Sequence, residues 1–321
     1  MKNTFQIAHI SDSHLSRQHY REHIKSFKML LRSMLDEGAD HIIISGDIVS
    51  TADEEDYYLA REILASHRLL NSHRLTIVPG NHDIFGGPHR AVDVLSFPQH
   101  IRGIDYMRHM ELFRNAFAET FYGVTRLNGA NLFPFIKSVG PFNIIGLNSI
   151  PPWSLRQNPL GTNGMLDDQQ FDALEKIASF GVLADRTNIV VIHHHFNDIL
   201  QSDYECGKFW TKIESNTMRM KRRKKITRLF QTLNVRYVLH GHIHRNEIYD
   251  RNGILFANGA GAVCDDPVRF LKYNVLEHSD GYCNIKIRQL PIPYQVSTVT
   301  QALHRMHKPL QIPIFAAKSL E

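Results

Sequence analysis

Five short polar clusters, in a fixed order along the chain, carry side chains that bind metal ions or move protons. The clusters are Asp12-Ser13-His14, Gly46-Asp47, Gly80-Asn81-His82-Asp83, His193-His194-His195 and Gly241-His242-Ile243-His244. Nearly all of them directly follow an apolar run rich in β-branched residues, which is typical of a buried strand. Carboxylate, imidazole and amide groups gathered at neighbouring strand ends would form a metal site.

The donor atoms in these clusters suit transition metals and outnumber the needs of one ion. Seven residues are candidate ligands: Asp12, His14, Asp47, Asn81, His193, His242 and His244. Oxygen and imidazole donors without a thiolate favour Mn, Fe or Zn and argue against a structural zinc knot. Asp47 could bridge two ions about 3.5–4 Å apart, which accounts for seven ligands. Because such a set of acids and imidazoles would be costly to bury unpaired, the sequence predicts two metal ions.

The apolar runs predict strands and helices that would place these clusters at one edge. The first part of the chain reads as three β-α units, with strands at 5–10, 41–45 and 75–78 and helices at 22–36 and 54–70. Polar residues at the carboxyl ends of successive strands indicate a layered sheet with its site along that edge.

The middle of the chain interrupts this rhythm and then resumes it. Residues 85–132 are expected to form a long excursion over the site, part loop and part helix, and 197–215 a second, irregular one. The remaining elements are expected as a hairpin pair at 133–139 and 142–147, helices at 166–177 and 217–233, and strands at 188–192 and 236–239.

The last part of the chain is expected to consist of hairpins. Asn-Gly and Asp-Gly pairs separate apolar runs at 247–253, 254–257, 272–276 and 283–289, which is a hairpin signal. The chain is thus expected to be α/β, with two mixed sheets facing each other and helices outside. We expect one domain over 1–290 and a peripheral tail over 291–321.

Composition limits the protein class. The chain has 321 residues, is 43% hydrophobic and 21% charged, and carries a net charge of +5, which suits an anionic substrate. No run approaches 18 uninterrupted apolar residues and the N-terminus has no room for a signal-peptide core, so neither a membrane span nor secretion is expected. Three scattered cysteines give no disulfide framework, which favours the cytoplasm. A homo-oligomer is compatible with the sequence, although no segment marks an interface.

Asp-x-His, Gly-Asp, Gly-Asn-His-Asp, His and Gly-His-x-His in this order resemble the calcineurin-like metallophosphoesterase superfamily. The resemblance runs from about residue 5 to residue 290 and is nearest to the class III cyclic-nucleotide phosphodiesterases, a branch that includes glycerophosphodiesterase-like enzymes. It implies a four-layer α/β/β/α sandwich. Any one cluster is a weak signal, but five in the correct order at strand ends are specific.

The resemblance also implies roles for the individual residues. A first metal would be held by Asp12, His14, Asp47 and His244, and a second by Asp47, Asn81, His193 and His242. Asn81 and His82 would bind the substrate. The catalytic residues would be His82, which would contact the scissile phosphate and help the leaving oxygen depart, and Asp83, which would support that turn or orient His82. His194 is the alternative ligand to His193 and otherwise a candidate substrate contact.

The activity implied is hydrolysis of a phosphodiester by a hydroxide that bridges the two metal ions. We expect a small substrate, such as a cyclic nucleotide or a glycerophosphodiester. Alternatives are a phosphomonoesterase or a nuclease of the same superfamily, or a non-catalytic scaffold subunit like some vesicle-sorting proteins. Scaffold subunits typically lose metal ligands, whereas this chain retains the complete set.

Two other features have competing interpretations. The segment from Arg219 to Arg228 is strongly basic and could bind nucleic acid, but an apolar stripe along the expected helix favours a solvated outer face. Nucleic acid is therefore not the favoured partner. Tyr204, Phe209 and Trp210 could line a pocket or could equally be loop packing.

Overall fold

The protein contains two mixed β-sheets. The computed structural model describes residues 4–87, 91–127, 129, 131–180, 183–197, 218, 220–244, 246–259, 270–279 and 281–291. The first sheet has the order β12-β11-β1-β2-β3. Its strands are β1 (Thr4–Ile10), β2 (His41–Ile44), β3 (Leu75–Ile77), β11 (Phe270–Ser279) and β12 (Tyr282–Pro291). Strands β1, β2 and β3 run parallel, so their carboxyl ends lie at one edge.

The second sheet is larger and contains another parallel group. Its order is β4-β5-β6-β7-β8-β10-β9. The strands are β4 (Thr125–Arg126), β5 (Phe135–Val139), β6 (Phe142–Gly146), β7 (Thr187–Val191), β8 (Val235–His240), β9 (Asn246–Arg251) and β10 (Ile254–Gly259). Because β6, β7 and β8 are parallel neighbours, the segments that follow β7 and β8 also emerge side by side.

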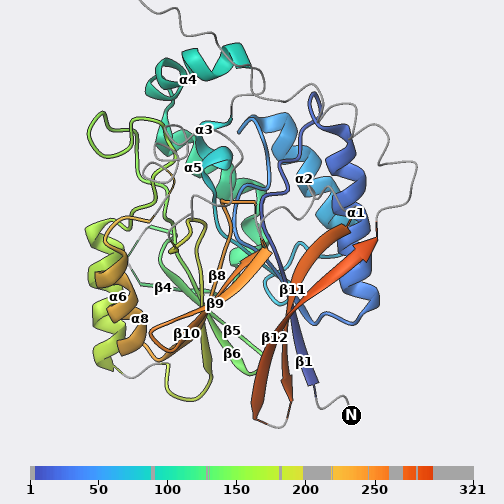
Figure 1. Cartoon of the computed structure of the whole chain (residues 1–321), viewed down its shortest axis with the longest axis vertical. Helices are drawn as coiled ribbons and strands as arrows, with labels where there is room; N and C mark the ends of the chain where they lie inside the picture. The colour runs from blue at the N-terminus through green and yellow to red at the C-terminus, as the bar shows by residue number, and fades with distance from the viewer. Residues whose placement is uncertain are drawn as a thin grey trace, which may run out of the picture.

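Helices cover the outer faces of both sheets, which gives four layers (Figure 1). Helices α1 (Arg21–Asp36) and α2 (Glu54–Ser66) flank the first sheet, and α6 (Asp168–Phe180) and α8 (Arg223–Thr232) flank the second. The excursion after β3 contains α3 (Asn81–Phe85), α4 (Ala91–Arg102), α5 (Tyr106–Ala116) and the 3-10 helix η1 (Ala118–Phe121). This architecture confirms the fold class expected from the sequence.

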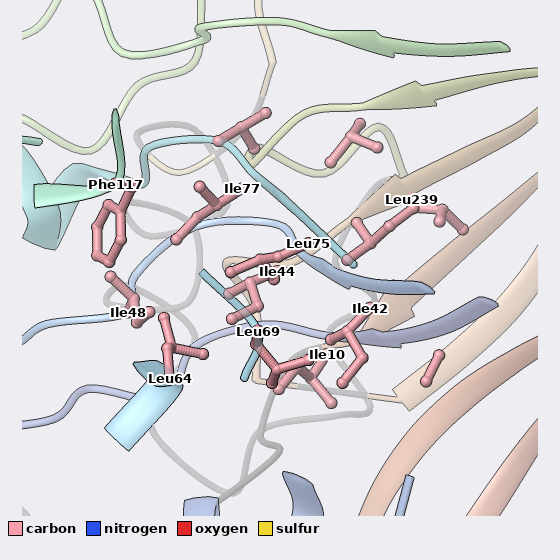
Figure 2. Packing of buried hydrophobic residues seen from close by; sticks show 14 of the residues in the cluster. Ile10, Ile42, Ile44, Ile48, Leu64, Leu69, Leu75, Ile77, Phe117 and Leu239 are labelled. Atoms are coloured by element: carbon pink, nitrogen blue, oxygen red, sulfur yellow. The ribbon is translucent and has the colours of Figure 1, made fainter. Parts of the chain in front are cut away.

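Hydrophobic residues from both sheets and their helices form the core. One large cluster of buried side chains includes Ile10, Ile42 and Ile44 from the first sheet and Leu239 from the second (Figure 2). A second cluster lies under α6 and α8 and includes Phe230. Burial of one such side chain contributes roughly 1.5–3 kcal/mol, so the strands are firmly held beneath the edge from which the polar clusters emerge.

The elements agree with the sequence prediction except near α8. The helix expected over 217–233 begins only at Arg223, because Arg222 adopts a left-handed backbone and Met220 forms a β-bridge with Gly164. The hairpin of β9 and β10 belongs to the second sheet, whereas that of β11 and β12 belongs to the first. Among the described residues, no helix has the length and apolar character needed to cross a membrane.

Several expectations fall outside the described residues. They are the excursion after residue 197 with Tyr204, Phe209 and Trp210, the basic residue Arg219, and the tail beyond residue 291.

Candidate metal centre

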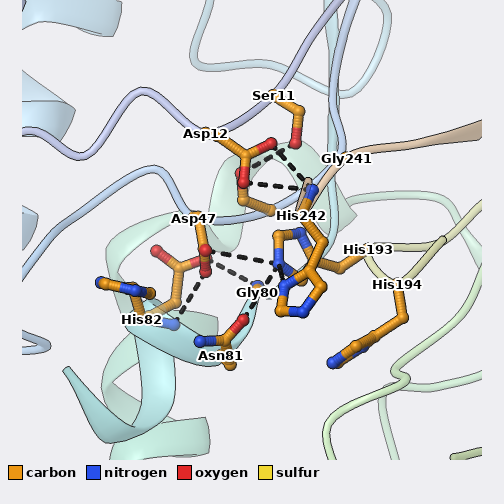
Figure 3. Close-up of polar contacts among 12 residues, drawn as sticks. Ser11, Asp12, Asp47, Gly80, Asn81, His82, His193, His194, Gly241 and His242 are labelled. Carbon is orange, nitrogen blue, oxygen red and sulfur yellow. Dashed lines mark hydrogen bonds and ion pairs between the residues drawn. The ribbon is translucent and has the colours of Figure 1, made fainter. Parts of the chain in front are cut away.

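The carboxyl ends of five strands bring the predicted donors together. Segments after β1, β2 and β3 come from the first sheet, and segments after β7 and β8 come from the second. The donors that they carry are Asp12, His14, Asp47, Asn81, His193, His242 and His244. All of these residues except His244 are buried. The site therefore lies where the two sheets meet, as Figure 3 shows for most of these residues.

The backbone at this edge is unusual. Asp12, His14, Asp47, His242 and His244 all have a left-handed conformation, with φ between 41° and 80°. This conformation is uncommon for residues other than glycine and costs free energy, so it persists only where the surroundings impose it. Its repetition at five candidate ligands marks this edge as a functional site on grounds independent of the sequence motifs.

One group of donors comes from the ends of β1 and β8. Ligand atoms of Asp12, His14 and His244 all lie within 4.8 Å of one another. The His14 Nε2 and His244 Nε2 atoms are 2.9 Å apart, and His244 Nε2 is 3.6 Å from Asp12 Oδ1. The Asp12 carboxylate also accepts hydrogen bonds from the backbone N–H of His242 at 3.0 and 3.1 Å, which ties the two sheets together.

Asp47 links this group to a second one. Its Oδ2 atom lies 3.9 Å from His14 Nε2 and 3.3 Å from His193 Nε2. His193 Nε2 in turn lies 3.1 Å from His242 Nδ1 and 3.2 Å from Asn81 Oδ1. Donor atoms of Asp47, His193 and His242 form a second cluster within 4.8 Å. Asp47 is thus placed between two sets of ligands.

The charges in the second group fit a cation. His193 Nδ1 lies 2.9 Å from the Ser45 carbonyl oxygen, which can only accept, so Nδ1 carries a hydrogen and Nε2 faces the site. Burial lowers the pKa of His193, but the adjacent Asp47 carboxylate outweighs burial and raises this pKa to about 9. A single Nε2 proton cannot satisfy Asp47, Asn81 and His242 together. A bound metal ion would replace that proton and take all the converging lone pairs.

His82 and Asp83 lie beside Asp47 and have different surroundings. The backbone N–H of His82 donates to Asp47 Oδ1 at 2.7 Å, and its half-buried ring packs 4.5 Å from the His14 ring. The Asp83 carboxylate accepts from the N–H groups of Val49 (3.0 Å) and Gly80 (2.8 Å). The Asp83 side chain therefore links the turns after β2 and β3.

The environment of Asp83 also separates it from the metal ligands. Burial, followed by the nearby Asp47 charge, raises the pKa of Asp83 to about 8. By contrast, burial alone would raise the pKa of the Asp47 carboxyl, but the surrounding imidazoles, above all that of His193, hold it well below its usual range. Of the two acids, Asp47 is therefore the one that presents a negative charge to a cation.

His194, the alternative to His193, has other partners. Its ring lies beside the His193 and His242 rings (Figure 3), with centroids 5.3 and 4.4 Å away. Its Nδ1 atom lies 2.8 Å from Ser149 Oγ and its Nε2 atom 3.0 Å from the Thr162 carbonyl oxygen. Among the described residues, the clusters of possible metal ligands include His193 and not His194.

Glycines give the donors room. A Cβ at Gly46 would lie 2.5 Å from His193 Nδ1, and Cβ atoms at Gly80 and Gly241 would overlap Asp47 and Asp12, respectively. These glycines belong to the sequence motifs. Cβ atoms at Gly87 and Gly164 would likewise overlap the rings of His82 and His194, respectively. Sequence analysis missed them, together with Ser149, because only the folded chain brings them next to the site.

Three side chains in the described part of the basic segment contact other residues of this protein. Arg222 forms an ion pair with Asp168 at 3.0 Å, Arg223 donates to the Phe196 carbonyl oxygen at 2.7 Å, and the Lys225 ammonium lies 3.8 Å from the centre of the Phe171 ring. The apolar stripe of α8 is buried, as expected. These contacts favour a solvated outer face over a nucleic-acid site.

Comparisons with known proteins identify the family. The family model described as calcineurin-like phosphoesterase matches residues 5–246. The chain is 33% identical over 84 residues to the glycerophosphodiester phosphodiesterase GpdQ of Enterobacter lignolyticus, an alignment that spans 24% of this chain and 29% of that protein. A solved dimetal phosphatase from Danio rerio has a TM-score of 0.56 at 14% identity, covering 90% of this chain and 99% of the other. The latter similarity supports the fold alone.

Proposed function

Because the chain belongs to the calcineurin-like phosphoesterase family, we propose that it is a dinuclear metal-dependent phosphodiesterase. The observation that carries the proposal is the position of Asp47, which lies within 4.8 Å of His14 and His82 on one side and forms the second cluster with His193 and His242 on the other. Its Oδ2 atom, 3.9 Å from His14 Nε2, joins it to the first cluster. One carboxylate in contact with both clusters is what a pair of ions sharing a ligand requires. No ligand position of the sequence motif is lost, which argues against a scaffold subunit.

We assign the ligands as the donor clusters suggest. The first cation would be held by Asp12, His14, Asp47 and His244, and the second by Asp47, Asn81, His193 and His242. This donor set fits Mn, Fe or Zn. When bound, such ions lower the pKa of water and neutralise charge on phosphate oxygens.

The protein's own groups would supply binding and proton transfer. Asn81, on the turn after β3, can contact the phosphate as well as a cation. His82 follows it on the same turn and has its backbone fixed by Asp47, so its half-buried imidazole can reach the leaving oxygen. Protonation of that oxygen by a positioned histidine typically accelerates such a step 10²–10⁴-fold. Asp83 acts indirectly by holding the turn.

We infer a small phosphodiester substrate. The partial similarity to a glycerophosphodiester phosphodiesterase supports this choice. The contacts of Arg222, Arg223 and Lys225 within the protein also favour a small substrate over nucleic acid. The free thiol of Cys283 and the scattered cysteines fit a reducing compartment, so we place the protein in the cytoplasm.

A substrate panel with defined metal content tests the proposal. Metal-free protein would be loaded with Mn, Zn or Fe and assayed with bis(p-nitrophenyl) phosphate, p-nitrophenyl phosphate, a glycerophosphodiester, a cyclic nucleotide and DNA. We expect metal-dependent hydrolysis of the small diesters to exceed that of the monoester and of DNA. No turnover with any metal would overturn the enzymatic proposal, and preference for the monoester or for DNA would overturn the substrate class.

A further inference from the structure

His194 is a buried residue with a fixed orientation beside the metal centre. It follows β7 directly after His193, and its backbone N–H donates to Ser149 Oγ at 3.3 Å. The same hydroxyl lies 2.8 Å from His194 Nδ1, and the carbonyl oxygen of Thr162 lies 3.0 Å from Nε2. Ser149 and Thr162 both belong to the loop over residues 147–167 that joins β6 to α6, here called the β6–α6 loop.

These contacts determine the hydrogen positions on the ring. The Thr162 carbonyl oxygen can only accept, so Nε2 of His194 carries a hydrogen and donates to it. The Ser149 hydroxyl, 2.8 Å away, is the hydrogen-bond partner of Nδ1. Both nitrogens are in use, so the imidazole has neither a free lone pair for a metal nor a free N–H for a substrate.

The ring fixed in this way supports another ring that would bind metal. The ring centroids of His194 and His242 are 4.4 Å apart, and those of His194 and His193 are 5.3 Å apart. Gly164 also lies against His194, because a Cβ there would overlap Cγ of the ring. The β6–α6 loop therefore confines the ring that packs on the two histidines of the second donor cluster.

His242 has a particular need for this support. Histidine ligands are usually oriented by a hydrogen bond from the nitrogen that does not bind the metal. His193 has such a bond to the Ser45 carbonyl. The Nε2 atom of His242 is buried and has no hydrogen-bond partner among the described residues. On that side of the ring, packing takes the place of a hydrogen bond. Of the three histidine rings that pack on His242, that of His194 is the closest, with centroids 4.4 Å apart.

We propose that His194 is a positioning residue that, held by Ser149 and Thr162 of the β6–α6 loop, aims the His242 imidazole at the second cation. This inference rests on the proposed function, because it presumes that His242 binds metal. It replaces the two roles considered from the sequence, an alternative ligand and a substrate contact, with an indirect one. It also makes the β6–α6 loop part of the metal centre although the loop supplies no ligand.

The test is calorimetric titration of metal-free protein with Mn²⁺ alone. Ser149→Ala removes the hydrogen-bond partner of Nδ1, and Ser149→Thr keeps a hydroxyl there. We expect Ser149→Ala to weaken binding of the second cation about 10–100-fold, the usual effect of removing an orienting partner, and to leave the first unchanged. Ser149→Thr should restore binding. Ser33→Ala, which removes a hydroxyl bonded to Tyr273 on the far side of the first sheet, is the matched control and should bind both ions normally.

A second variant approaches the ring from the other side. Gly164→Ala would displace the His194 ring from its packing on His242, so it should produce the same selective loss even if Ser149→Ala folds poorly. Unchanged affinities in both variants, with two ions bound by the native protein, would overturn the positioning role alone. Uptake of fewer than two ions by the native protein would instead overturn the proposed function. A general loss of both ions with a lower melting temperature would identify His194 as merely structural.

Discussion

Replacing Gly87 by alanine should selectively slow hydrolysis of esters with poor leaving groups. A Cβ at this position would lie well under 3.0 Å from Cε1 and Nδ1 of His82, whereas ordinary contacts are about 3.5–4.0 Å. The imidazole must therefore retreat by about 1 Å or more. A misplacement of about 1 Å can cost on the order of 10²-fold in rate, and the whole contribution of a general acid is about 10²–10⁴-fold.

The assay compares two leaving groups. With a diester that releases an alkoxide, we expect kcat of Gly87→Ala to fall by about 10²-fold or more because the leaving oxygen needs a proton. With bis(p-nitrophenyl) phosphate, the fall should be much smaller because nitrophenolate leaves readily without one. Metal content should stay at the native level, because the side chain that moves, His82, is not among the seven assigned ligands.

The matched control is Gly103→Ala, where a Cβ would meet no atom closer than the His100 carbonyl oxygen at 3.5 Å. This variant should behave like the native protein with both substrates. A native rate for Gly87→Ala on the alkyl diester would refute the role of His82 as the acid. An equal loss on both diesters would also refute it, because the effect would then not lie at the leaving group.

Three further predictions concern stability. Burial lowers the pKa of Lys137 to about 7, so the unfolded chain keeps a proton at this residue above pH 7 that the native protein has lost. Denaturant titrations should therefore show the free energy of unfolding rising by up to about 1.4 kcal/mol per pH unit from pH 7 toward 10. Lys137→Met should remove this rise. Burial, then the nearby Lys137, lowers the pKa of His41 to about 3, so the unfolded chain gains a proton there that the native protein does not. The contribution of His41 to the free energy of unfolding should therefore fall by about 1.4 kcal/mol per unit as the pH drops from 6.5 toward 3. His41→Gln should lose stability less steeply than the native protein by that amount, and equal slopes would contradict this assignment. Asp83→Asn leaves Val49 N–H or Gly80 N–H without its acceptor, which should cost about 1–3 kcal/mol in thermal unfolding; an unchanged melting temperature would contradict that role.

The candidate ligands could be predicted from the sequence because each follows a buried strand. An apolar run ending in a polar cluster specifies both a strand and the edge at which its last residues emerge. Asp47 and His193 are distant in sequence, yet Oδ2 of the first lies 3.3 Å from Nε2 of the second. The parallel order of β1, β2 and β3 gathers the segments of the first sheet at one edge, and that of β7 and β8 does the same in the second sheet. The two groups meet because the sheets pack face to face.

Features that depend on contacts between distant segments could not be predicted in this way. The residues before Arg223 have a helical pattern, but the bridge between Met220 and Gly164 takes the chain out of the helix. The orientation of His194 depends on Ser149, 45 residues away. Nothing in the histidine triplet itself distinguishes a ring that faces Asp47 from one that faces the β6–α6 loop.

The central claim is that two cations share the Asp47 carboxylate. Anomalous diffraction from crystals of the Mn²⁺-loaded protein tests it most directly. The account predicts two peaks about 3.5–4 Å apart, one on each side of Asp47, with Asp12 and His244 at the first and Asn81 and His242 at the second. A single peak, or two peaks that do not both contact Asp47, would contradict it.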